Sequence, residues 1–199
     1  VDEKGQVVDG DILIGIFAKY QLDQGIINQG DTVVGTVMTN LGLENYLKEI
    51  GLNLHRTKVG DRYILEYMRE NNCLLGGEPS GHIIFKQHST TGDGSLAAIK
   101  LAEVIRTSGK TLSVLAKEVK LYPQKLVNIK VQSKPVLEEN KNIKVVLEEA
   151  EQDFGGKGRF LVRYSGTEPI LRVMVEGDKK ELVDKVSEKI VNAVKSELT

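Results

Sequence analysis

The hydrophobic positions of about the first 107 residues form short apolar runs separated by amphipathic segments. The run Thr32–Met38 is β-branched and almost wholly apolar, which is typical of a strand covered on both faces. We expect further strands at Gln6–Asp9, Leu52–Val59, Leu74–Leu75 and His82–Phe85, and helices at Ile12–Leu22, Leu43–Ile50, Asp61–Glu70 and from Gly94. Strands that alternate with helices at this spacing predict βαβ units and a mainly parallel sheet over about residues 26–107.

The sequence also predicts which residues cap the helices and which helical residues face the core. Asp11 and Asp61 are placed to cap the free N–H groups at the start of the first and third helices. In the helix from Gly94, four apolar residues recur at helical spacing and are expected to face the core: Ala98, Leu101, Ala102 and Ile105.

The pattern changes near Tyr122. Lys125–Val131 alternates polar and apolar residues, as a half-exposed antiparallel strand does. Two more strands are expected at Arg159–Tyr164 and Ile170–Val175, and the last segment, Asp178–Leu198, is an amphipathic helix. Its apolar face holds Leu182, Val186, Ile190 and Val194. We therefore predict a mixed, mainly parallel α/β domain followed by a small α+β domain with a largely antiparallel sheet.

Composition narrows the class of protein. The 199 residues have a formal net charge of −1, which argues against a nucleic-acid partner because such proteins normally carry a basic face. Cys73 is the only cysteine, which excludes a disulfide framework and a multi-cysteine zinc site. The longest apolar stretch, Ile12–Ala18, is too short to span a membrane, so a cytoplasmic protein is expected. The chain begins at Val1, which suggests that it was cut from a longer protein.

The first candidate site is the loop Gly76–His82, between two short expected strands. Its glycines let the backbone approach a ligand closely, and Glu78 offers acceptors for sugar hydroxyls. Ser80 can donate or accept a hydrogen bond, and the imidazole of His82 can donate or accept a proton. A tight turn with a surface carboxylate and a histidine explains the same composition equally well.

The second candidate site is the loop between the strands Arg159–Tyr164 and Ile170–Val175. Four of its residues could together bind an anion: Arg163, Ser165, Gly166 and Thr167. The spacing of Ser165 and Glu168 also matches a capping box. Since a strand rather than a helix follows, the anion site is favoured.

Other turns give weaker signals. Lys58 ends a strand and Asp61 opens a helix, which is the usual rim position for ligands in open α/β sheets. The turn Thr90–Gly94 is more typical of a structural connection. Neither candidate loop matches a dinucleotide-binding or P-loop motif, so a nucleotide cofactor is not indicated.

The motifs GGEPSGH, TTGDGSLAAIKLAEV and RYSGTEPILRVMVEG, with KVGDRY before them, resemble the α-D-phosphohexomutase superfamily over essentially the whole chain. Within it, the resemblance is closest to the bacterial mutases that act on glucosamine phosphates. The resemblance implies that residues 1–25 end a metal-binding second domain, residues 26–120 form a sugar-recognition third domain and residues 121–199 form a phosphate-binding fourth domain.

The resemblance also implies roles for individual residues. Glu78 and Ser80 would bind the ring hydroxyls of the sugar. The non-reacting phosphate would be held by Arg163, Ser165, Gly166 and Thr167. His82 and Lys58 match positions near the sugar and could transfer a proton or stabilise charge. Asp61 stands where some relatives have histidine.

The resemblance implies a catalytic serine, phosphorylated during turnover, and an Mg²⁺ ion whose carboxylate ligands would lie upstream of Val1. Asp9-Gly10-Asp11 only imitates the metal loop, so the fragment is expected to bind sugar phosphate without catalysis. The implied reaction of the parent, an isomerase, interconverts glucosamine 6-phosphate and glucosamine 1-phosphate through a bisphosphate intermediate, toward peptidoglycan precursors. The full-length parent could assemble as a homodimer.

Three alternatives stay open. The parent could be a phosphomannomutase or phosphoglucomutase relative, or a sugar-phosphate isomerase in which Glu78 and His82 form the acid/base pair. The chain could instead be a non-catalytic sugar-phosphate-binding module. No nucleic-acid or membrane partner is expected.

Overall fold

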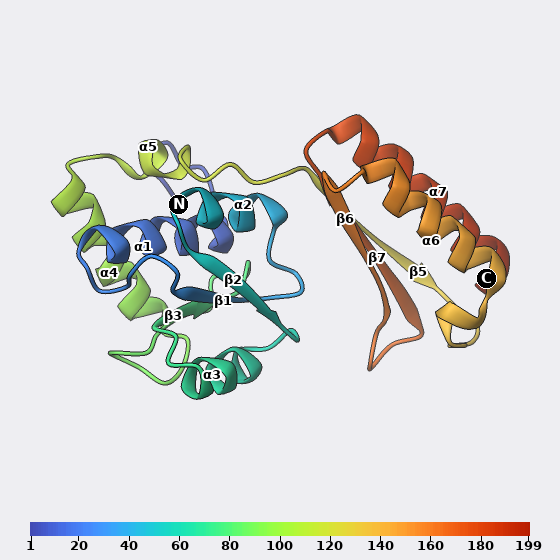
Figure 1. Ribbon diagram of the computed structural model, residues 1–199, viewed down its shortest axis with the longest axis horizontal. Coiled ribbons are helices and arrows are strands. Elements are labelled where there is room, and N and C mark those ends of the chain that lie inside the picture. The colour runs from blue at the N-terminus through green and yellow to red at the C-terminus, as the bar shows by residue number, and fades with distance from the viewer. The chain divides into compact units, whose positions relative to one another are not determined.

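The computed structural model describes the backbone of residues 1–199 and the side chains of residues 1–137 and 139–199. The chain folds into two compact units, Val1–Leu121 and Tyr122–Thr199. Figure 1 shows that each unit has its own sheet and its own helices. No helix in the described part of the chain has the length and hydrophobicity needed to span a bilayer.

The first unit contains a four-stranded sheet in the order β2-β1-β3-β4. The strands are β1 (Thr32–Thr36), β2 (Asn53–Thr57), β3 (Leu75–Gly77) and β4 (Ile83–Phe85). β1 runs parallel to both β2 and β3, and β4 runs antiparallel to β3. The predicted mixed, mainly parallel sheet is therefore confirmed.

Helices cover both faces of this sheet. They are α1 (Gly10–Asp23), α2 (Leu41–Glu49), α3 (Asp61–Glu70), α4 (Gly94–Ser108) and α5 (Leu112–Ala116). Val33 packs in one apolar cluster with residues of α1, α2, α4 and α5, whereas Val34 packs in a second cluster with residues of α3. Successive side chains of a strand point to opposite faces, which explains this division. β1 is thus covered on both faces, as its apolar sequence predicts (Figure 1).

The predicted start of α1 is wrong in two respects. Residues Gln6–Asp9 form no strand, and the helix begins at Gly10. Its cap is Asp9, whose extended backbone lets its side chain accept a hydrogen bond from the Asp11 N–H at 2.8 Å. Asp11 lies inside the first turn, where it is buried and accepts a hydrogen bond from the Asn40 N–H at 2.7 Å. Its carboxylate therefore ties α1 to the loop before α2 instead of capping α1.

Two further details of the helices differ from expectation. Gly60, with a φ of 128°, precedes α3 as its cap and makes no side-chain capping bond, so Asp61 is the first helical residue and not the cap. In α4 the buried residues are Ala97 and Val104, while Ala98 and Ala102 are exposed. Leu101 and Ile105 pack against the core as predicted, so only the two alanines of the stripe were assigned to the wrong face.

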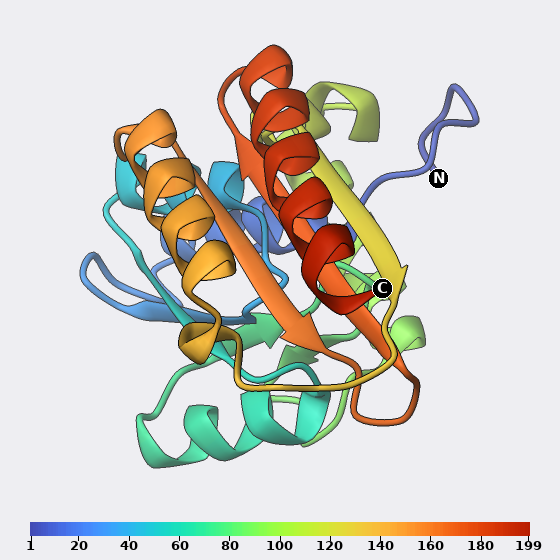
Figure 2. The same cartoon turned by 90° about the vertical axis from the view of Figure 1, so that its right-hand side faces the viewer.

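The second unit is an antiparallel sheet covered on one face by two helices. Its strands are β5 (Gln124–Lys130), β6 (Gly158–Tyr164) and β7 (Ile170–Gly177), in the order β5-β7-β6. A short 3₁₀ helix, η1 (Leu137–Glu139), precedes α6 (Lys141–Phe154), and α7 (Lys180–Leu198) ends the chain. Figure 2 shows α6 and α7 side by side over the sheet.

The core of this unit lies between β7 and the two helices. Alternate residues of β7 are fully buried there: Leu171, Val173 and Val175. The predicted apolar stripe of α7 is confirmed, since Val186, Ile190 and Val194 are buried and Leu182 packs against the same cluster. The intervening residues of β7, including Arg172, point to the face of the sheet that these helices do not cover.

Candidate functional site

Two loops of the first unit meet at the carboxyl ends of its parallel strands. β2 runs into the loop 58–60, and β3 runs into the loop 78–82. The Gly60 N–H donates a hydrogen bond to Glu78 Oε1 at 3.0 Å, so the half-buried Glu78 carboxylate lies against the start of α3. In open α/β sheets the carboxyl ends of the strands are the usual position for a ligand.

The loop 78–82 has a defined backbone conformation. The Gly81 N–H donates to the Glu78 carbonyl at 2.9 Å, and Gly81 has a φ of 92°, which favours glycine. The N-terminus of α1 abuts the loop, since the Gly10 N–H donates to the Pro79 carbonyl at 3.0 Å. A Cβ on Gly10 would lie 2.6 Å from that oxygen. Gly10 therefore shapes the loop, a role that the sequence did not indicate because the contact is tertiary.

Ser80 and His82 are exposed neighbours on this loop. The Ser80 hydroxyl and His82 Nδ1 share a hydrogen bond of 3.0 Å. Since Nδ1 is engaged in this way, Nε2 is the ring nitrogen of His82 that remains for proton transfer to or from a ligand.

Lys58 and Asp61 flank the contact between Gly60 and Glu78. Lys58 Nζ lies 6.0 Å from the centre of the Tyr63 ring, and the Arg62 guanidinium lies at the same distance from that ring. Among the described side chains, neither Lys58 nor Asp61 makes a hydrogen bond or an ion pair. The structure therefore groups Glu78, Lys58 and Asp61 around one pair of loops.

The residues that could suggest a magnesium site are engaged in other contacts. Asp9 and Asp93 each accept a backbone N–H as helix caps, and Asp11 accepts the Asn40 N–H. No group of three or more metal-ligating side chains occurs among the described residues. The donor sets of the described residues therefore do not fit Mg²⁺.

The second candidate loop, Ser165–Pro169, joins β6 to β7 and is closed by backbone hydrogen bonds. The Ser165 N–H donates to the Ile170 carbonyl at 2.8 Å. Ser165 is buried, and its hydroxyl accepts a hydrogen bond from the Glu168 N–H at 3.3 Å. The contact expected of a capping box is thus present, although a strand follows. Gly166 and Thr167 are exposed at the tip.

Three cations surround the base of this loop. Arg163 on β6 lies directly opposite Arg172 on β7. Arg172 pairs with Glu168 at 3.4 Å, whereas Arg163 has no hydrogen-bond or ion-pair partner among the described side chains. Lys134 Nζ donates to the Ser165 carbonyl at 2.7 Å. Like charges that face each other across two strands are unfavourable, which suits this end of the sheet to an anion.

Sequence reasoning missed Arg172 and Lys134. The first could have been found by counting outward from the turn, because each strand residue before a hairpin loop has a partner after it. The second could not, since Lys134 belongs to the connection after β5 and reaches the loop only through the fold.

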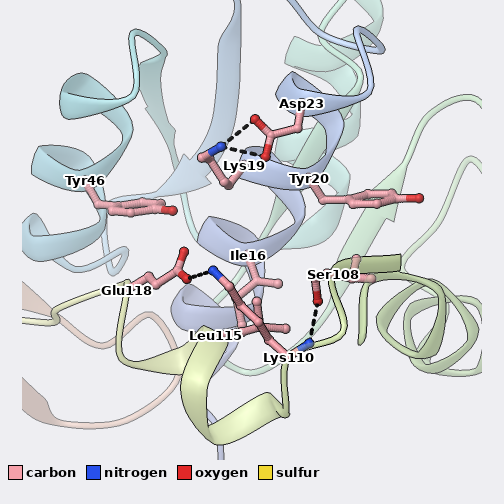
Figure 3. Close-up of a pocket in the computed structure, with 10 residues that line it drawn as sticks. Ile16, Lys19, Tyr20, Asp23, Tyr46, Ser108, Lys110, Leu115 and Glu118 are labelled. Atoms are coloured by element: carbon pink, nitrogen blue, oxygen red, sulfur yellow. Dashed lines mark hydrogen bonds and ion pairs between the residues drawn. The ribbon is translucent and has the colours of Figure 1, made fainter. Parts of the chain in front are cut away.

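A separate pocket of the first unit has a volume of about 120 Å³. Figure 3 shows the side chains that line it. Tyr20 and Tyr46 line it together with the ion pair of Lys110 and Glu118 at 2.6 Å. Burial raises the pKa of Tyr46 to about 12. None of the site residues predicted from the sequence lines this pocket.

Both units match sequence models of domains from one known protein family. Residues 9–122 match the sequence model of phosphoglucomutase/phosphomannomutase alpha/beta/alpha domain III, and residues 126–193 match that of the C-terminal domain. The chain belongs to the phosphoglucomutase/phosphomannomutase family. The resemblance to the phosphohexomutase superfamily is thereby confirmed.

Curated members of the family are similar over the whole chain. A phosphoglucosamine mutase of Listeria monocytogenes is 51% identical, one of Lactococcus lactis is 51% identical and one of Bacillus velezensis is 50% identical, each over 100% of this chain. The chain spans 44% of the length of these relatives.

Solved structures of the family share the fold. An N-acetylphosphoglucosamine mutase of Aspergillus fumigatus superposes with a TM-score of 0.83 at 20% identity, over 96% of this chain and 44% of that chain. A complex of that enzyme with GlcNAc-6P and magnesium has a TM-score of 0.80 at 18% identity, over 95% of this chain and 47% of that chain. These similarities confirm the predicted fold class.

Proposed function

We propose that this chain supplies sugar and phosphate recognition for a phosphoglucosamine mutase, which interconverts glucosamine 6-phosphate and glucosamine 1-phosphate in the cytoplasm. The pair of facing arginines at the base of the loop Ser165–Pro169 carries the proposal, because it suits that loop to a phosphate group. The identity of about 50% with phosphoglucosamine mutases along the whole chain supports this substrate.

The second unit would bind the phosphate that does not react. Arg163 can hold two phosphate oxygens at once, because its guanidinium presents parallel N–H groups. The exposed backbone of Gly166 and the Thr167 hydroxyl would add hydrogen bonds at the tip. Ser165, whose oxygen already accepts the Glu168 N–H, keeps its O–H as a donor. Arg172 would join the site when its long contact with Glu168 is exchanged for phosphate.

The first unit would recognise the sugar. Glu78 keeps acceptor capacity beyond its bond to Gly60 and would accept hydrogen bonds from ring hydroxyls. Ser80 would add a donor or an acceptor beside it. His82 Nε2 and Lys58 would transfer a proton or stabilise charge during phosphoryl transfer.

The proposal assigns the phosphoryl donor and the metal ion of the reaction to none of the residues of this chain. The proposed reaction uses a phosphoserine donor and a bisphosphate intermediate, and the family resemblance implies Mg²⁺, which phosphoryl transfer commonly requires. Asp9, Asp11 and Asp93 are engaged in other contacts and do not fit that ion. The division into residues 1–25, 26–120 and 121–199 stays a prediction, although α1 packs in the core of the first unit.

Calorimetric titration of the 199-residue chain tests the proposal. Glucosamine 6-phosphate and inorganic phosphate should both bind, and phosphate should compete with the sugar phosphate. Arg69→Ala, which removes an exposed arginine of α3, serves as a control for loss of positive charge and should bind both ligands normally. If neither ligand binds the unaltered chain, the proposed function is wrong.

A further inference from the structure

Asp61 occupies a position on α3 where packing favours an apolar side chain. Ile64 and Met68, three and seven residues further along, are fully buried in the cluster between α3 and the sheet. Residues at these spacings share one face of a helix. Asp61 therefore begins the sheet-facing stripe of α3, and it is itself half-buried.

The Asp61 carboxylate has no structural partner. It does not cap α3, and within the described part of the chain it forms no hydrogen bond or ion pair. The neighbouring cations of Lys58 and Arg62 lie near the Tyr63 ring. The acceptor oxygens of Asp61 therefore remain available to a positively charged ligand group.

The backbone of Asp61 lies close to the loop that would bind the sugar. The hydrogen bond of 3.0 Å between the Gly60 N–H and Glu78 Oε1 fixes the residue before Asp61 against Glu78. Standard backbone dimensions then place the Asp61 Cα within about 8 Å of the Glu78 carboxylate. Carboxylates on these two neighbouring segments would attract an ammonium group of a bound ligand.

We propose that Asp61 binds the protonated 2-amino group of an amino-sugar phosphate, while Glu78 accepts hydrogen bonds from the neighbouring ring hydroxyls. This inference rests on the proposed function, because it takes the loop 78–82 as the sugar site. A hydrogen bond between an ammonium and a carboxylate is stronger than one from a neutral hydroxyl. Asp61 would therefore set the preference for glucosamine phosphate over glucose phosphate.

Paired titrations test this role. The 199-residue chain and its Asp61→Asn variant are titrated with glucosamine 6-phosphate, glucose 6-phosphate and inorganic phosphate. The unaltered chain should bind the amino sugar about tenfold more tightly than glucose 6-phosphate. Asp61→Asn should abolish that preference by weakening only the amino sugar. Glu66→Gln, which removes an exposed carboxylate from the same helix, should keep it.

Two results would overturn the inference. The first is an equal loss of affinity for both sugar phosphates in Asp61→Asn, which would refute a specificity role while leaving the proposed function intact. The second is an unaltered chain that binds neither sugar phosphate, which would refute both. Asp61→Ser also suits a helix N-terminus and lacks the charge, so it gives the same readout if the asparagine variant does not fold.

Discussion

The proposed phosphate recognition should depend most on Arg163, because it faces Arg172 and has no partner among the described side chains. Arg163→Ala should lower the affinity of the chain for inorganic phosphate and for glucosamine 6-phosphate. The lost charge-assisted hydrogen bonds are worth about 1.5–3 kcal/mol, or about a 10- to 150-fold change in Kd. Calorimetric titration beside the Arg69→Ala control measures the change. Equal affinities in Arg163→Ala and the unaltered chain would refute the assignment of this loop.

Glu78 should act on the sugar and not on the phosphate. Glu78→Gln keeps an oxygen for the Gly60 N–H but replaces a charged acceptor of sugar hydroxyls with a neutral one. We expect about a tenfold weaker affinity for glucosamine 6-phosphate and an unchanged affinity for inorganic phosphate. Competition between the two ligands in one titration reports both values. A sugar affinity unaffected by this change would mean that the loop is only structural.

Replacing Gly10 tests whether the conformation of the loop 78–82 depends on its contact with the N-terminus of α1. A Cβ on this residue would collide with the backbone of residues 79 and 81, so Gly10→Ala should displace the loop 78–82. The affinity for glucosamine 6-phosphate should fall while that for inorganic phosphate is retained, as titration of both ligands would reveal. Gly94→Ala is a suitable control, since a Cβ there meets no atom within 4 Å. Identical sugar affinities in the two variants would contradict this view of the loop.

Among the secondary-structure elements, β7 carries the most consequential buried charge. Glu176 is fully buried, forms an ion pair with Arg159 and accepts a hydrogen bond from Gln124 Nε2 at 2.9 Å. Glu176→Ala would leave Arg159 without its counter-charge and should lower the free energy of unfolding by about 3 kcal/mol. Urea unfolding followed by circular dichroism measures this loss. Lys144→Met, which removes a 3.9 Å contact between exposed side chains on α6, should change little, and equal losses in both variants would count against the buried pair.

The type of most elements follows from the sequence because hydrophobic periodicity reports burial directly. The apolar run Thr32–Met38 predicted β1 and its coverage on both faces, and the spacing of Val186, Ile190 and Val194 predicted the buried face of α7. In α4, Leu101 and Ile105 of the predicted stripe pack against the core, whereas its two alanines, Ala98 and Ala102, are exposed. Alanine carries too little hydrophobic surface to set the rotation of a helix.

The candidate site was less accessible to sequence reasoning than the fold. The loops containing Glu78 and Arg163 stood out because glycine, proline and charged residues concentrate there. The contacts that position them could not be read in the same way, since Gly10, Asp11 and Lys134 act across the fold on residues distant in sequence. Asp9 and Asp11 are separated by one residue, yet only the backbone angles decide which of them caps α1.

For the whole molecule, we expect folding without mutase activity. Each unit has its own apolar core, so each should unfold cooperatively when the chain is heated. Phosphoryl transfer needs a positioned phosphoryl donor and neutralisation of charge by a metal ion, and the proposal assigns neither to these residues. A mutase assay with Mg²⁺ and a bisphosphate primer should therefore give background rates.

A full-length phosphoglucosamine mutase, such as the 51% identical relative of Listeria monocytogenes, serves as the positive control in that assay. Turnover by the highly purified chain that disappears when one of its own residues is replaced would contradict the expectation. Such a result would show that a catalytic nucleophile lies within these 199 residues.

The loops 78–82 and 165–169 are the proposed ligand-binding surfaces of the chain. Amide chemical shifts of the isotope-labelled chain, followed during titration with glucosamine 6-phosphate, test this claim most directly. We predict saturable shifts concentrated in these two loops and at Arg163 and Arg172, with inorganic phosphate moving only the second loop. Shifts confined to other surfaces, such as the pocket beside Tyr20 and Tyr46, or no saturable shifts at all, would contradict the claim.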